Sequence, residues 1–309
     1  MELRLQIEPQ FGATYEQQLT FTRAAEELGF AAMLRADHFV NTAGGDGLPG
    51  PTDAWVTLGA LARETTTIRL GTLVTSVHFR APGLLAVSAA QVDEMSGGRL
   101  EIGIGAGWFE REHVAFGFPF PPIGERLDRL EEQIEILTGM WATPVGETFT
   151  FTGRHYQLED CPGLPKPFQQ PHPPIICGGY GTRRTPSLTA RFADEFNIGL
   201  AGVAATAEQF QRVRAACEEL GRDPDTLVYS ASTTVSVGAT TAEAHRRVEA
   251  AGATLEEVNQ LGIAGTPAEV IEHLHARAEV GAQRCYLRVL DITDLDHLAL
   301  IAAEIMPHA

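Results

Sequence analysis

Lysine is almost missing from this chain of 309 residues: Lys166 is its single lysine, and arginine supplies the rest of its 23 basic residues. An enzyme that forms a Schiff base with its substrate needs a lysine amine inside its site. Lys166 lies in a proline-rich stretch and does not follow a predicted strand. The sequence therefore argues against a Schiff-base aldolase.

Cysteine is scarce and scattered. The chain has four, with no C-x-x-C pair among them: Cys161, Cys177, Cys217 and Cys285. It also lacks an H-E-x-x-H motif and any cluster of histidine and cysteine, which are the usual ligand patterns of zinc sites. We therefore expect no metal site, and we expect reduced thiols, as in a cytoplasmic protein.

Positive charge and long apolar runs are lacking as well. The formal net charge is −17 at pH 7, and so acidic a surface repels nucleic-acid phosphates and anionic lipids. No apolar run approaches the length that spans a membrane. A strand pattern starts directly after Met1, so we expect no signal peptide. These absences predict a cytoplasmic protein that binds a small-molecule substrate and neither nucleic acid nor membrane.

What the chain does have is a regular alternation of short apolar strands with helices. We predict strands at 3–7, 31–35, 68–74, 100–104, 174–177, 195–198, 227–237 and 285–289. Such strands between helices indicate a parallel sheet that is covered on all sides. Their number and the chain length favour an α/β fold of the (β/α)₈ TIM-barrel type over a doubly wound open sheet. No compositional linker divides the chain, so we predict one domain over residues 1–309.

One excursion interrupts the alternation. The longest amphipathic helix is predicted at 126–141, with apolar residues at helical spacing and charges on the other face. Residues 142–173 then break the pattern: 148–151 resemble a strand of a hairpin, and prolines are dense after Cys161. Because the alternation resumes unchanged, we interpret 142–173 as an ordered insertion after the long fourth helix.

The stretch 96–110 marks the first candidate site, because a TIM barrel carries its active site at the carboxyl ends of its strands. Gly103, Gly105 and Gly107 leave the backbone bare where a strand ends. A bare strand end suits the approach of a flat ligand, but tightly packed neighbouring strands would need the same glycines. The spacing is not the dinucleotide fingerprint, since Trp108 stands where its third glycine belongs.

Polar and aromatic residues follow other strand ends. His38, after Asp37, can exchange a proton near neutral pH and is a candidate acid or base. The alternative is a loop histidine that is bonded to a backbone carbonyl. Trp108 either stacks on a planar ring or caps the barrel mouth. Three residues beyond it either face a substrate or form an exposed helical turn: Glu110, Glu112 and His113.

A glycine-rich turn, Gly178-Gly179-Tyr180-Gly181, leads into a predicted helix. Free amides and the helix dipole make such a turn an anion site. Arg183 and Arg184 add the positive charge that the acidic chain otherwise lacks, so we predict phosphate binding here. The alternative is an ordinary turn with solvated arginines. Arg80, near another helix start, is a weaker second anion contact.

Together these motifs resemble the bacterial luciferase-like superfamily of flavin and deazaflavin oxidoreductases. The similar segments are Ala36–Phe39, 70–82, 96–110, Gly178-Gly179 with Ala193-Asp194, and Gly265–Pro267. The stretch 96–110 is the most specific of them. The resemblance covers nearly the whole chain, and 142–173 lies where this family carries an insertion.

The resemblance implies a TIM barrel that forms a homodimer. It implies binding of coenzyme F420, a 5-deazaflavin with a phosphate and an anionic tail, or alternatively of FMN. Asp37 and His38 would be catalytic beside the ring. The residues assigned to the cofactor are Asp37, Thr72, Leu73, Val74, Thr75, Gly105, Ala106, Gly107, Trp108, Gly178, Gly179, Tyr180, Gly181, Arg183 and Arg184. A non-proline cis peptide bond is implied between Leu73 and Val74, in a bulge that backs the ring.

The implied function is hydride transfer between F420 and a small organic substrate, with His38 moving the accompanying proton. One alternative is an FMN-dependent monooxygenase that needs a reductase as its partner. Another is a non-catalytic flavin-binding protein, against which the presence of Asp37 and His38 argues. Some deazaflavin dehydrogenases carry an acid where this chain has Trp108, so that residue argues against a sugar-phosphate substrate. We expect Phe116, Phe118 and Phe120, with 142–173, to shape the substrate pocket.

Overall fold

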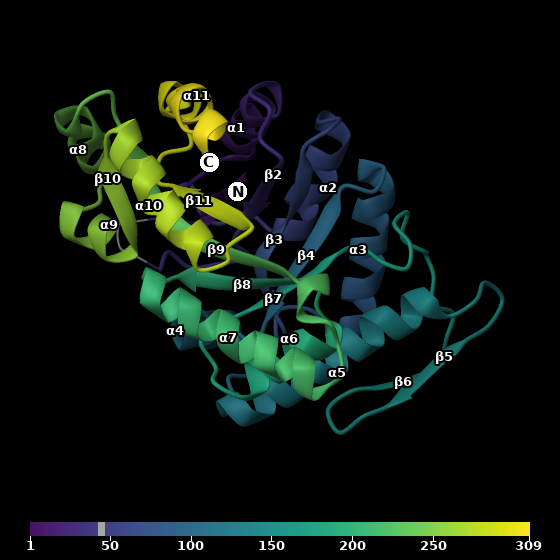
Figure 1. Cartoon of the computed structure of the whole chain (residues 1–309). Helices are drawn as coiled ribbons and strands as arrows, with labels where there is room; N and C mark the ends of the chain where they lie inside the picture. The colour runs from purple at the N-terminus through teal and green to yellow at the C-terminus, as the bar shows by residue number, and fades with distance from the viewer. Residues whose placement is uncertain (43–46) are drawn as a thin grey trace.

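In the computed structural model, which describes residues 1–42 and 47–309, eight parallel strands close into a barrel (Figure 1). The barrel strands are β1 (Glu2–Ile7), β2 (Ala32–Arg35), β3 (Arg69–Ser76), β4 (Leu100–Gly105), β7 (Ile175–Gly178), β8 (Glu195–Leu200), β9 (Val228–Val237) and β11 (Arg284–Val289). They pair in chain order, and β11 pairs with β1 to complete the ring. The predicted (β/α)₈ TIM barrel is confirmed.

Helices cover the outside of the barrel (Figure 1). They are α1 (Tyr15–Glu27), α2 (Ala54–Glu64), α3 (Pro82–Ser96), α4 (Glu110–Phe116), α5 (Ile123–Ala142), α6 (Arg184–Phe192), α7 (Val203–Glu219), α8 (Thr241–Ala250), α9 (Leu255–Leu261), α10 (Pro267–Glu279) and α11 (Leu295–Glu304). Local sequence defines their starts: Thr14 and Gln17 form a capping box at α1, which satisfies two amides that a helix end leaves unpaired. At α8 the cap is Thr240, whose hydroxyl accepts the Glu243 amide.

Strand β9 is long enough to pair with two strands on one side. Its first part, Val228–Ser232, pairs with β8, and Thr234–Val237 pairs with the short strand β10 (Gly262–Gly265). We did not predict β10, because four residues carry too little periodicity to reveal a strand. A Cβ at Gly262 would lie 1.8 Å from the Thr234 carbonyl oxygen, so the close pairing requires glycine there.

A hairpin projects from the barrel after α5 (lower right in Figure 1). It consists of β5 (Phe149–Thr152) and β6 (Gln157–Cys161), which pair in antiparallel fashion and lie outside the barrel sheet. The hairpin strand predicted at 148–151 is therefore present. Beyond it, Lys166 Nζ donates to the carbonyls of Met140 and Trp141 at 2.7 and 3.2 Å. The single lysine thus caps the last turn of α5.

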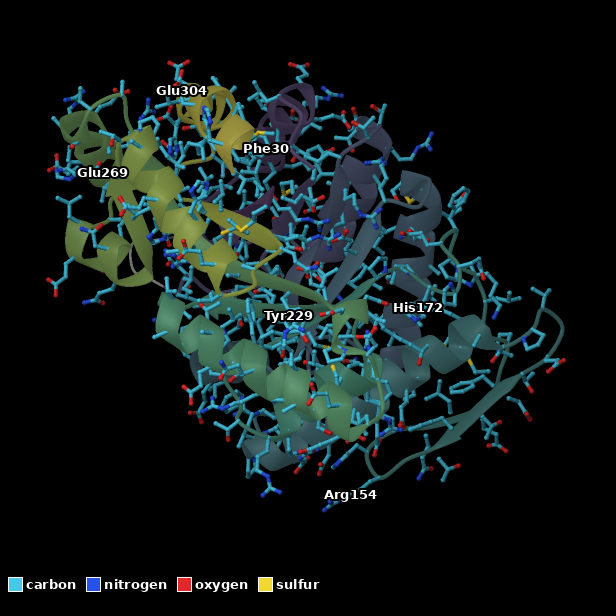
Figure 2. The ribbon with its side chains drawn as sticks, in the orientation of Figure 1. Phe30, Arg154, His172, Tyr229, Glu269 and Glu304 are labelled. Carbon is cyan, nitrogen blue, oxygen red and sulfur yellow. The ribbon has the colours of Figure 1, made fainter. Side chains whose placement is uncertain are left out.

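Alternate residues of the strands point to opposite sides of the barrel wall. Leu3, Leu5 and Ile7 of β1 pack outward in the core beneath the helices. Arg154 lies at the periphery of the molecule in Figure 2, while Tyr229, labelled near the centre, is only 1% exposed.

The inside of the barrel carries a small apolar cluster above a set of charges. The cluster contains Ala32, Leu34, Leu73, Ile176 and Tyr286. Below it lies what we call the floor network: Arg4, Glu101, Glu195 and the Tyr286 hydroxyl, all at most 2% exposed. Arg4 Nη1 donates to Glu101 Oε2 at 2.5 Å, and the Tyr286 hydroxyl donates to Glu195 Oε1 at 2.8 Å. The side chains of the floor network fill the amino-terminal end of the barrel.

The paired charges set the ionisation of the floor network. Burial opposes ionisation of Glu101, but the guanidinium groups of Arg4 and Arg69 outweigh it and hold the pKa of that carboxyl below its ordinary value. Burial raises the pKa of Glu195. Removing one member would leave its partner charged and unpaired in the interior, which is strongly destabilising.

Candidate active site

A cavity of about 1410 Å³ opens at the carboxyl ends of the barrel strands, and every one of the eight strands or the turn after it contributes to its wall. This is where active sites of TIM barrels lie. Most of the predicted site residues line it: Asp37, His38, Leu73, Val74, Gly105, Ala106, Gly107, Trp108, Gly178, Gly179, Tyr180 and Gly181. Thr72, Thr75, Arg183 and Arg184 do not.

The end of β3 bulges into this cavity. The Leu73–Val74 peptide bond is cis, as the resemblance implied, and the pairing of β3 with β4 shifts register between Thr72 and Thr75. A Cβ at Gly105 would lie 2.9 Å from Val74 Cγ2. Close packing of neighbouring strands therefore accounts for the glycine at 105.

Gly103 and Gly107 have structural reasons of their own. A Cβ at Gly103 would lie 2.1 Å from the Thr72 carbonyl oxygen, so this glycine also serves strand packing. Gly107 has a φ of +77°, a backbone conformation that favours glycine. Gly107 forms the turn that directly precedes Trp108. The same bare backbone leaves an open wall on the β4 side of the cavity.

The side chain of His38 is held by a buried carboxylate. Its Nδ1 lies 2.9 Å from Oε2 of Glu112, a residue of α4 that is fully buried. Oε1 of Glu112 accepts the backbone amides of Phe39 and Val40, the latter at 3.1 Å. A carboxylate accepts and cannot donate, so Nδ1 carries the proton in this contact. Nε2 has no hydrogen-bond partner within residues 1–42 and 47–309 and belongs to the cavity wall.

The carboxylate of Asp37 is already occupied. It accepts the Thr75 hydroxyl at 2.6 Å and Arg80 Nη1 at 2.5 Å. Arg80 in turn reaches Asp53 at 2.5 Å, and these two carboxylates outweigh burial and raise the pKa of Arg80. The suggestion that Arg80 is a second anion contact is wrong, because both ends of its guanidinium are paired with acids. Thr75 supports Asp37 from behind the cavity wall.

Helix α4 corrects another expectation. We left open an exposed helical turn for Glu110, Glu112 and His113, but Glu112 and His113 are at most 1% exposed. His113 Nδ1 contacts the Phe109 carbonyl at 2.9 Å. Trp108 is 66% exposed and meets the His38 ring edge-on with centroids 5.7 Å apart. It stands at the cavity mouth above the imidazole.

The expected aromatic pocket differs from the one observed. Phe118 and Phe120 pack around the His113 ring, with centroids 6.4 and 4.8 Å away, and Phe116 lies against Phe39. None of these three phenylalanines lines the cavity, whose described phenylalanines are Phe11 and Phe79. The three therefore support the wall and do not form it.

The glycine turn after β7 is braced from below. Gln209 Nε2 donates to the carbonyls of Gly179 and Gly181, at 3.3 and 2.8 Å. Helix α6 follows with no side-chain cap on its first turn, so its amides stay available to an anion. Arg184 is held by Asp128 at 2.7 Å and by the Gly124 carbonyl. Arg183 is exposed and has no ion-pair partner in the described parts of the chain.

Comparison with known proteins places these features in a family. A family model described as "Luciferase-like monooxygenase" matches residues 3–257. The chain belongs to this family. This member of the family has the bulge in β3, the pair of His38 and Glu112, and the glycine turn after β7 that are described above.

The names of similar proteins mention two kinds of cofactor, reduced FMN and F420. An FMNH(2)-dependent dimethylsulfone monooxygenase of Pseudomonas putida is 34% identical over 135 residues, 44% of this chain and 36% of that protein. An F420-dependent glucose-6-phosphate dehydrogenase of Microbacterium testaceum is 34% identical over 188 residues, 60% and 53% of the two chains. The chain spans about half the length of the curated relatives it matches.

A solved structure extends the match across the barrel. An F420-dependent secondary alcohol dehydrogenase in complex with an F420-acetone adduct superposes with a TM-score of 0.86, covering 98% of both chains at 18% identity. At this identity the likeness shows the fold alone. Within the described residues of this luciferase-like protein, no helix is long and apolar enough to cross a membrane, and no His, Cys, Asp and Glu cluster could hold a metal.

The luciferase-like barrel also presents polar residues that the sequence analysis missed. Gln6 and Arg288 line the cavity from β1 and β11, next to Glu8, which directly follows β1. The prediction of β1 rested on its alternating apolar residues and did not consider the polar residues between them. That second period of two, Arg4, Gln6 and Glu8, was the signal that could have found them.

Proposed function

We propose that this protein is a deazaflavin-dependent oxidoreductase that transfers a hydride between F420 and a small organic substrate. The observation that carries the proposal is the His38–Glu112 dyad, which presents Nε2 of His38 to the cavity while Nδ1 stays bonded to a buried carboxylate. Named relatives and a solved structure of the same fold that depend on F420 support it.

The residues of the cavity fit such a cofactor. One wall is formed by the β3 bulge at Val74 and by the small residues Gly105 and Ala106, and it would hold the ring. The turn Gly178–Gly181 and the uncapped start of α6 would hold the phosphate through backbone amides. Arg183 would add charge from outside the cavity, whereas Arg184 is engaged with Asp128. A volume of about 1410 Å³ leaves room for a substrate beside the ring.

Bound deazaflavin would supply or accept the hydride, and the chain itself handles the proton. In its doubly protonated imidazolium form, His38 donates the Nε2 proton to the substrate oxygen or nitrogen as the neighbouring carbon gains hydride, and the neutral imidazole accepts that proton in the reverse direction. Glu112 holds the Nδ1–H bond throughout and stabilises the imidazolium that forms in the reverse reaction. Trp108 covers the imidazole at the mouth and limits access of water. Asp37 positions the strand end through Thr75 and Arg80.

The alternative with direct support is an FMN-dependent monooxygenase that receives reduced flavin from a partner reductase. The match to an FMNH(2)-dependent relative favours it over other flavin chemistry. The same wall and the same glycine turn would serve that cofactor. Because the geometry fits both cofactors, a measurement of which cofactor binds more tightly is what separates the two functions.

Titration of ligand-free protein with F420 and with FMN tests the proposal. We expect F420 to bind at least tenfold more tightly than FMN, with fluorescence as the measurement. Reduced F420 should then be oxidised by enones or imines in a protein-dependent manner. Tighter binding of FMN, with oxygen consumption that requires a flavin reductase, would replace the proposal by the monooxygenase alternative.

Arg183 and Arg184 provide a matched pair for the phosphate contact. Replacing Arg183 with alanine is expected to weaken FMN binding about threefold to tenfold, because an exposed charge near a phosphate contributes modestly. Arg184→Ala should change affinity less than twofold, since that side chain already pairs with Asp128. Riboflavin, which lacks the phosphate, should bind both variants equally. Unchanged FMN affinity in Arg183→Ala would show that the turn acts without Arg183.

A further inference from the structure

We propose that the substrate carries a neutral, apolar substituent that extends from the reacting carbon along one face of α5. That face consists of Ile123, Leu127 and Leu130, and all three residues line the cavity. We call the part of the cavity beside them the apolar arm. The inference rests on the proposed function only in calling the occupant of the arm a substrate.

The three side chains form a single stripe on α5. They are spaced by four and by three residues, and residues at these spacings are neighbours on one face of a helix. Between Ile123 and Leu130 the helix also carries four charged residues, and none of these four lines the cavity. The cavity therefore meets only the apolar stripe of an otherwise charged segment.

Hydrogen bonds fix the direction in which this stripe faces. On one flank, Arg126 Nη1 donates to the Gly107 carbonyl at 2.6 Å and holds α5 against the turn after β4. On the other flank, Arg184 of α6 donates to the Gly124 carbonyl at 2.8 Å and pairs with Asp128 at 2.7 Å. At about 100° of rotation per residue, the stripe lies between these two flanks. It therefore faces the gap between the β4 turn and the start of α6.

The walls next to the stripe are uncharged. Leu188 of α6 and Trp108 of the β4 turn line the cavity with it, and no charged residue of α5 or α6 belongs to the described lining. The cofactor phosphate proposed above uses backbone amides at the start of α6, about one turn before Leu188. An anionic group along the stripe itself would lose its hydration without gaining a partner. The arm therefore favours a neutral group.

Exposure of the stripe rises toward its outer end. Leu130 is 5% exposed, Leu127 is half-buried and Ile123 is 54% exposed. Packing against the main core accounts for Leu130, but it leaves half of the Ile123 surface in water, where a ligand that covers it gains binding energy. The arm thus runs outward from Leu130 to Ile123 over about 10 Å of helix.

Trp108 connects the arm to the reaction site. Its ring meets the His38 imidazole edge-on, with centroids 5.7 Å apart. It directly follows Gly107, whose carbonyl is held by Arg126 of α5. A substrate with its polar atom at His38 Nε2 therefore reaches α5 past this one indole ring. This continuity with the reaction site is why we assign the arm to a part of the substrate and not to a protein partner.

Methyl ketones with butyl, hexyl, octyl and decyl chains test the arm, because the carbonyl stays constant while the chain grows. Binding is measured by calorimetry on protein saturated with oxidised F420, or with oxidised FMN if FMN binds more tightly, so that no hydride is transferred. We expect affinity to rise about threefold per methylene until the chain passes Ile123, and then to level off. Equal affinity for all four ketones would overturn the inference.

Polar replacements at two depths locate the chain. Ile123→Asn should remove the gain only for the longest chains and should keep the affinity for the butyl ketone within twofold. Leu127→Gln should remove the gain from the hexyl ketone onward. If both variants keep the wild-type dependence on chain length, the chain lies elsewhere and the inference is wrong. Thermal melting shows whether each variant folds, and the exposed position of Ile123 keeps the test valid if Leu127→Gln does not.

Val114→Asn is the matched control. Val114 is 70% exposed on α4 and does not line the cavity, so its replacement should leave the whole ketone series within twofold of the wild type. Oxidation of reduced F420 by the same ketones is assayed separately. Dependence on chain length without turnover would count against the proposed function and leave the arm in place, whereas turnover without that dependence would refute the arm alone.

Discussion

Replacing His38 with asparagine is expected to slow substrate reduction by about 10²–10⁴-fold, the range that a positioned acid or base contributes. Asparagine can still donate to Glu112, so the loop should keep its place, but it cannot deliver a proton from the position of Nε2. Affinity for the cofactor should change less than threefold. The measurement is single-turnover oxidation of bound, reduced F420 by an enone or imine.

His275→Asn is the control for this experiment. His275 contacts the His308 carbonyl near the carboxyl terminus and does not line the cavity. Its replacement should leave the rate within a factor of two. If His38→Asn reacts at the wild-type rate while the cofactor still binds, the proton comes from solvent or another group, and His38 has only a structural place in the wall.

Glutamine at position 112 is expected to reverse the tautomer of His38. Oxygen of the new amide can still accept the amides of Phe39 and Val40, which leaves its NH₂ group facing Nδ1. Nδ1 must then accept, and Nε2 carries the proton. An imidazole in this form cannot take a proton from an alcohol, so oxidation in the reverse direction should fall on the order of 10²-fold.

The tautomer itself is the readout that separates positioning from stability. Imidazole ¹⁵N chemical shifts show which nitrogen of His38 is protonated, and we expect the assignment to exchange between the wild type and Glu112→Gln. Glu110→Gln is the matched control, because Glu110 is an exposed residue of the same helix outside the cavity wall. An unchanged tautomer in Glu112→Gln, with or without loss of rate, would refute the role given to Glu112.

Local sequence patterns predicted most of the barrel fold. The barrel followed from strands that alternate with helices, since this periodicity reflects burial on both faces of a parallel sheet. His38 was placed at the cavity because strand ends converge in this fold. The cis bond at Leu73–Val74 came from the family resemblance and not from residue chemistry.

Contacts between distant segments could not be predicted. Glu112 reaches His38 across 74 positions, and nothing local marks one glutamate of α4 as buried and its neighbour Glu110 as exposed. The two arginines after β7 look equivalent in sequence, but only the fold brings Asp128 of α5 to Arg184. Gln6 was overlooked because one face of β1 satisfied the search for apolar residues, while the polar face turned into the barrel.

The floor network closes one end of the barrel with buried, mutually paired charges, and among the described residues the cavity lies at the opposite end, beside the strand ends. Gln6, two residues above Arg4 on β1, lies deep in that cavity, whereas His38 and Trp108 stand near its mouth. Two ligands that share such a passage cannot exchange independently. For the proposed pairing of cofactor and substrate, we expect the ligand in the deeper position to enter first and to leave last.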